Sequence, residues 1–142
     1  MTQGDLAKRD LRRAELILEE ARAYLQKKAW NLVVRRAQEA TELALKAALR
    51  SVGVEPPRVH DVGPALREHS QRFPAFFVEA IPKLASISRA LRNERETSLY
   101  GDVETGTPPE ELYFESDAWE ALDKTDFVLR ICQRLVEGRD GP

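Results

Sequence analysis

The spacing of apolar residues in the first third of the chain most constrains the fold. Between residues 5 and 25, apolar side chains follow one another at alternating intervals of three and four, at Leu11, Ala14, Leu18, Ala21 and Leu25. This spacing places them on one face of an α-helix, because a helix turns once every 3.6 residues. It predicts an amphipathic helix over residues 5–25.

A second apolar run extends over residues 28–52 and is rich in alanine. It forms two neighbouring stripes, one at Trp30, Val33, Ala37, Ala40, Ala44 and Ala47 and the other at Val34, Thr41, Leu45 and Ala48. Gly53 then supplies a stop signal. Two stripes favour burial against two neighbours. Two interpretations stay open: an ordinary central helix of a bundle, or a helix that also forms a dimer surface.

Breaker and capping residues divide the rest of the chain. Asp61 is placed to cap a short helix toward His69, and Pro82 is expected near the start of a segment that ends near Arg95. Residues 100–116 are rich in Gly and Pro and predict an irregular connection. Ser116 is expected to cap the last helix.

No alternating strand pattern of useful length is found, so the sequence predicts an all-α fold. We expect an up-and-down bundle of four main helices plus a short helix, as a single domain over residues 1–142. With 42% hydrophobic residues, a chain of this length has the size of one domain. No apolar stretch approaches a membrane span, and we expect a cytoplasmic protein that does not contact membranes.

Charge is unevenly distributed, although the formal net charge is only −2. Residues 26–50 hold six Lys or Arg against two acids, a balance of +4, whereas residues 100–126 hold nine acids against Lys124, a balance of −8. This asymmetry is compatible with a basic partner, with an acidic ligand, or with packing of the chain on itself.

Several kinds of chemistry lack their residues. The two histidines, His60 and His69, stand nine apart without a nearby cysteine, so no metal-ligand spacing is present. Cys132, the only cysteine, lies in an apolar helical pattern and is expected in the core. Neither a glycine-rich phosphate loop nor a nucleophile elbow is found. We therefore expect no metal, no cofactor and no triad chemistry.

Two polar segments are candidates for function. Arg35, Glu39, Glu42 and Lys46 share one face of the second helix, either as solvated ion pairs or as a polar strip beside a subunit junction that faces residues 89–95. The second segment, RNERETSLYGD at residues 92–102, gathers arginines, hydroxyl groups and Tyr100. It is either a site or the end of a helix whose arginines pair with neighbouring acids.

The order of the motifs resembles the HEPN domain family. The alanine-rich second helix contains Glu42 and Lys46, Pro56 and Pro57 follow in the linker, and a His-Asp-hydrophobic motif stands at His60, Asp61 and Leu66. The C-terminal ESDAWEALDKTDFVLRICQRL is similar to the last helix of that family, and the similarity spans roughly residues 6–136.

This resemblance implies a helical bundle that forms a homodimer and is often encoded beside a small nucleotidyltransferase as a toxin–antitoxin pair. Active members are metal-independent ribonucleases with an Arg, four to six residues and a His at a cleft between protomers. Here no histidine follows Arg89, Arg92 or Arg95, and in the frame Asn93, Ser98, Tyr100 only the tyrosine matches. Tyrosine alone is a poor base at neutral pH.

The resemblance therefore implies a dimer that binds a nucleotide or RNA and cleaves RNA little or not at all. Arg92 and Arg95 would hold a phosphate and Tyr100 would offer its hydroxyl or ring, with Asn93 and Ser98 in the same frame. The strip from Arg35 to Lys46 of a second protomer would face them. Two alternatives remain: an RNA endonuclease with an unconventional site, and a non-enzymatic helical interaction module that acts through its acidic loop.

Overall fold

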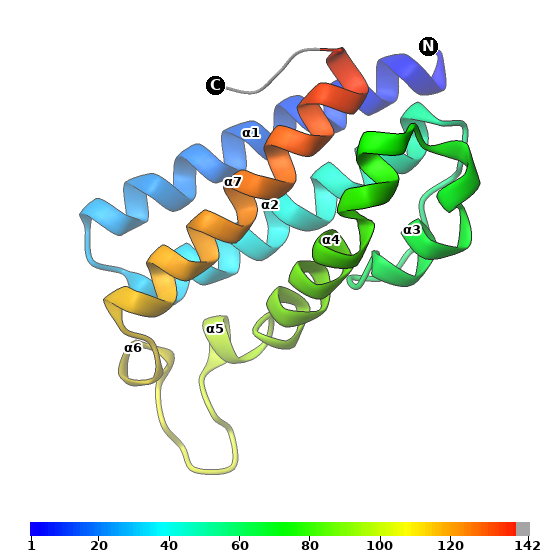
Figure 1. Ribbon diagram of the computed structural model, residues 1–142. Helices are drawn as coiled ribbons and strands as arrows, with labels where there is room; N and C mark the ends of the chain where they lie inside the picture. Colours follow the sequence, from blue (N-terminus) through cyan, green and yellow to red (C-terminus); the bar gives the residue numbers. More distant parts are fainter. Residues whose placement is uncertain (139–142) are drawn as a thin grey trace.

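Four long helices run alternately up and down in the computed structural model, which describes residues 1–138 (Figure 1). They are α1 (Gln3–Gln26), α2 (Trp30–Ser51), α4 (Ala75–Asn93) and α7 (Glu115–Glu137). The short elements are α3 (Gly63–Glu68), a 3-10 turn at Ser70–Arg72, α5 (Thr97–Tyr100) and α6 (Pro109–Leu112). Within the described residues the only strand-like pairing is a bridge between Asp102 and Thr107. The all-α prediction is confirmed, with three short helices where one was expected.

The central helix of the bundle is α2. Its main contacts are with α1 and α7, and it also touches α4 and α5. The alanines of both stripes are fully buried in the single chain, at Ala37, Ala40, Ala44, Ala47 and Ala48. Small side chains at these positions let the neighbouring helices approach closely. The two stripes are therefore accounted for within one protomer, which favours the ordinary central helix over a dimer surface on this face.

The linker after α2 is fixed to α4 by polar contacts around Asp61. The Asp61 carboxylate accepts hydrogen bonds from the Gly63 N–H at 3.1 Å and from the Ser88 hydroxyl at 3.0 Å, and Ser88 in turn accepts from the Val62 N–H. Gly63 packs directly on α4, because a Cβ there would come within 3.0 Å of the Ala85 Cβ. These contacts hold α3 against the middle of α4.

The segment from α5 through α6, residues 97–112, closes one end of the bundle and is called the tip below. It carries an ordered turn: Asp102 and Thr107 exchange backbone hydrogen bonds, and Gly101 adopts φ +79° with no room for a side chain beside the Thr107 carbonyl. The connection predicted as irregular, residues 100–116, thus contains the helical turn α6 and a closed loop. In Figure 1 this loop extends away from the four long helices.

Two boundary predictions are wrong. Pro82 lies inside α4, which begins seven residues earlier at Ala75. The proline is tolerated because it and Val78, whose carbonyl loses its partner, lie on the exposed side of the helix where water can replace the bond. Ser116 lies within the first turn of α7, and the Phe114 N–H is instead capped by the Asp117 carboxylate at 2.8 Å.

Two further expectations concern the core and the membrane. Cys132 is fully buried, and this burial raises the pKa of its thiol well above the ordinary value. The thiol is accordingly a packing group. None of the helices in the described part of the chain has the length and apolar content needed to cross a bilayer.

Candidate phosphate-binding site

The polar strip of α2 contacts the turn from α4 into α5, residues 94–98, within one chain; this turn is called the corner below. Lys46 pairs with Glu42 at 3.0 Å, and the other oxygen of Glu42 accepts a hydrogen bond from Gln38 at 3.0 Å. The oxygen of Gln38 accepts from the Arg95 guanidinium at 2.8 Å. An unbroken series of contacts therefore joins Lys46 to Arg95, and the strip faces the corner of its own protomer.

Arg95 and Ser98 are parts of this scaffold. The Arg95 carbonyl accepts hydrogen bonds from the Arg35 guanidinium and from the Ser98 hydroxyl. Ser98 is fully buried, and its own carbonyl accepts from the Asn31 amide. The groups that fix the turn into α5 are thus already engaged. Glu39 pairs with Arg36 at 2.6 Å and more distantly with Arg35.

Glu42 is the junction of the strip. Its side chain is only 16% exposed. Burial by itself would raise the pKa of this carboxyl, but the hydrogen bonds from Lys46, Gln38 and His60 outweigh it, and the net pKa is lowered. The carboxylate is therefore charged at neutral pH.

His60 lies beside this carboxylate, a contact that the sequence did not predict. Its Nδ1 is 2.9 Å from Glu42, and half of its side chain is exposed. The two residues are eighteen apart in sequence, so no local spacing signals the pair. The His-Asp motif at the entrance to α3 was the available signal, since it marks a linker that returns to α2.

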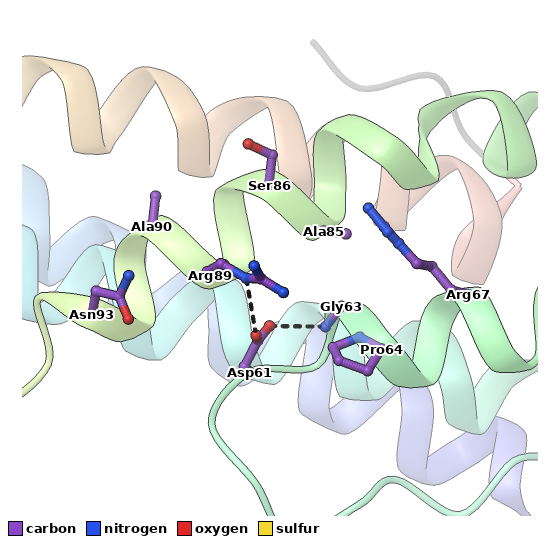
Figure 2. A pocket seen from close by; sticks show the side chains of 9 residues that line it. All are labelled: Asp61, Gly63, Pro64, Arg67, Ala85, Ser86, Arg89, Ala90 and Asn93. Atoms are coloured by element: carbon purple, nitrogen blue, oxygen red, sulfur yellow. Dashed lines mark hydrogen bonds and ion pairs between the residues drawn. The ribbon is translucent and has the colours of Figure 1, made fainter.

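A groove of about 700 Å³ lies between α3 and α4. Figure 2 shows Arg67 of α3 and Arg89 of α4 extending toward the space between the two helices. Ser86 and Asn93 lie one turn before and one turn after Arg89 on the same exposed face of α4. The groove therefore offers two guanidinium groups, a hydroxyl and an amide, which are donors suited to phosphate oxygens.

These donors are largely uncommitted. Among the described residues Arg67 has no hydrogen bond or ion pair. Arg89 is 73% exposed and approaches Asp61 only at 3.9 Å. Asn93 makes one long contact, at 3.5 Å, with Arg92. By contrast, the arginines of α2 are all engaged by acids or carbonyl groups.

A second hollow of about 620 Å³ adjoins the first and shares Asp61 and Pro64 with it. Arg58, His60 and Arg92 are the cationic or titratable side chains that line it, together with Glu68. Arg92 and Asn93, both predicted site residues, thus line different hollows. Tyr100 lines neither; it is 67% exposed on α5.

The site is built for binding an anion more than for moving protons. The α3–α4 groove contains no histidine, cysteine or tyrosine among its lining residues. No group of three or more potential metal ligands is found among the described residues. Sequence reasoning missed Arg67 because nothing near it in the sequence marks α3 as the opposite wall of a groove.

Comparison with known proteins agrees with this architecture. The HEPN domain profile matches residues 7–135. The fold is similar to the crystal structure of ST0689, an archaeal HEPN homologue, with TM-score 0.72 and 25% identity over 92% of this chain and 97% of that one. It is also similar in fold to TT1696 from Thermus thermophilus, with TM-score 0.73 and 23% identity over 90% and 96% of the two chains.

The match covers most of the sequence, and the chain belongs to the HEPN domain family. No curated protein matches the sequence significantly.

Proposed function

We propose that this HEPN protein binds the phosphate of a nucleotide or RNA in the groove between α3 and α4. The observation that carries the proposal is the convergence of Arg67 and Arg89, from two different helices, on one groove (Figure 2). Arg67 has no partner among the described residues, and Arg89 has only a distant ion pair with Asp61, at 3.9 Å. Arginine forms paired, charge-assisted hydrogen bonds with phosphate oxygens. The volume of the groove falls in the range of small-ligand sites.

We also propose that the protein cleaves RNA little or not at all by the family's usual route. No histidine follows the arginines of α4 in the sequence, and the Arg95 guanidinium is engaged by Gln38. Loss of a positioned acid–base group typically lowers a rate by roughly two to four powers of ten.

The assay is incubation of the protein with single-stranded RNA in chelator, followed by denaturing electrophoresis. We expect intact RNA. Cleavage that disappears in Arg95→Ala would instead support the alternative of an unconventional endonuclease.

Binding is tested by calorimetric titration of adenosine monophosphate and of a short RNA. In Arg67→Ala/Arg89→Ala we expect the affinity to fall about a hundredfold or more, since each of the two charge-assisted hydrogen bonds contributes roughly 1.5 to 3 kcal/mol. Arg12→Ala/Arg130→Ala is the matched control, because these two arginines line a separate hollow between α1 and α7. The groove would not be the binding site if both double variants lost affinity equally, or if wild type bound neither ligand.

A role in protein interaction is the second candidate function, and the tip favours it. Side chains of Tyr100, Val103 and Phe114 are 67%, 86% and 66% exposed at this end of the bundle. Residues 96–123 contain nine acids and no Lys or Arg. Exposed apolar side chains in a segment rich in carboxylates fit a cationic protein surface. We propose that a small nucleotidyltransferase docks there, as the family resemblance implies, and that the protein itself is a homodimer.

A further inference from the structure

The two adjoining hollows differ in the cations that line them. The first has Arg67 and Arg89, and the second has Arg58, His60 and Arg92. The two hollows adjoin, since they share Asp61 and Pro64 as lining residues. Together they form a continuous surface with five groups that are cationic or can become so.

The cations of the second hollow are also uncommitted. Arg58 has no hydrogen bond or ion pair among the described residues, and Arg92 makes only its long contact with Asn93. His60 is held through Nδ1 by Glu42, which leaves its Nε2 without a partner in the described structure. Each hollow therefore has donors for a phosphate of its own.

Two acidic residues, Asp61 and Glu68, line this surface, and they lie at its internal boundary and at its edge. Asp61 stands at the shared boundary, where one carboxylate oxygen accepts from Ser88 and the Gly63 N–H and the other lies 3.9 Å from the Arg89 guanidinium. Its negative charge disfavours a phosphate at the boundary itself, so two phosphates are best placed on either side of it. Glu68, at the edge of the second hollow, has its charge directed toward His69 at 3.9 Å.

We infer that the ligand is an oligonucleotide strand whose consecutive phosphates occupy the two hollows, with Arg67 and Arg89 holding one phosphate and Arg58, His60 and Arg92 the next. This inference rests on the proposed function and names its ligand class. A mononucleotide would use the first hollow alone. Apolar lining residues of the second hollow, Pro57, Val59 and Ala65, offer a surface against which a base can pack.

The test compares ligands of different length by fluorescence polarisation. We would measure the affinity of a labelled tetra-adenylate RNA directly and that of adenosine monophosphate as its competitor. The proteins are wild type, Arg58→Ala/Arg92→Ala and Arg67→Ala/Arg89→Ala. The first double variant should weaken the tetranucleotide about tenfold and change the mononucleotide less than about twofold, whereas the second should weaken both ligands. Arg12→Ala/Arg130→Ala should change neither.

Inorganic tripolyphosphate distinguishes the strand from a free polyphosphate, because it supplies linked phosphates without bases. We expect it to compete less well than the tetranucleotide. Three results would overturn the inference while leaving the first hollow as a phosphate site. Tripolyphosphate could compete as well as the tetranucleotide. Alternatively, Arg58→Ala/Arg92→Ala could weaken the binding of both nucleotides equally, or weaken neither. If no nucleotide binds wild type, the proposed function fails with it.

Discussion

At the scale of residues, the arginines of this chain divide into two groups by what their guanidinium groups contact. Arg35, Arg50 and Arg95 have partners in the same chain and are partly buried. Arg67 and Arg89 lie in solvent beside a groove. The sequence places all of them on helices and does not separate the groups, because the partners come from elements far apart in the chain. Of these five arginines, only Arg67 and Arg89 have exposed charge to offer a ligand.

Glu42 gives a prediction for pH. Its pKa is lowered in the folded protein, so its stabilising effect is complete above the ordinary value of 4.5 and is lost as the pH falls through the folded pKa. Glu42→Gln should reduce the free energy of unfolding by about 1 to 2 kcal/mol at neutral pH. Urea unfolding of both proteins should show this difference shrinking below about pH 4. A difference that stays constant across the acid range would contradict this role.

At the scale of elements, the apolar spacing predicted the long helices, whereas the details at their ends depend on local contacts. The four long helices follow from apolar spacing, and the boundaries of α1 and α2 agree with the expected ones within about two residues. Pro82 and Ser116 were placed wrongly because the outcome depended on the exposed side of α4 and on competition from Asp117 for the cap. The groove was not predictable, since it needs Gly63 packed on Ala85.

Gly101 determines the shape of the tip. A side chain there would overlap the Thr107 carbonyl and would also require a backbone conformation with φ +79°. Gly101→Ala should destabilise the protein by roughly 2 kcal/mol or more. Gly106→Ala is the control, because Gly106 has φ +70° but open space around it, and should cost about 1 kcal/mol. Thermal unfolding measures both; equal losses would rule out the steric explanation.

At the scale of the whole molecule, charge is separated between two regions. Uncommitted cations line the hollows beside α3, whereas acids surround the tip. Two tips of this charge repel each other, so a homodimer that pairs them symmetrically is disfavoured. The same charge keeps a nucleic acid away from the tip and directs it to the α3–α4 side. The sequence shows this separation as opposite net charges of two segments, but only the folded structure shows where the two charged regions lie.

The oligomeric state is a prediction of the proposed function. We expect light scattering at tens of micromolar to give about twice the chain mass of 16.1 kDa. Because the alanine stripes of α2 are buried within the protomer, the contact must involve other surfaces, and substituting these alanines is not a test of it. A mass equal to one chain throughout this concentration range would remove the homodimer from the account.

The salt dependence of RNA binding tests the central claim most directly. Each arginine that contacts a phosphate adds roughly one to the slope of log affinity against log salt concentration. Between about 50 and 200 mM salt, wild type and Arg12→Ala/Arg130→Ala should therefore show the same slope, and Arg67→Ala/Arg89→Ala a slope smaller by roughly two. If removing Arg67 and Arg89 leaves the slope unchanged, these arginines do not hold phosphate and the groove between α3 and α4 is not the site.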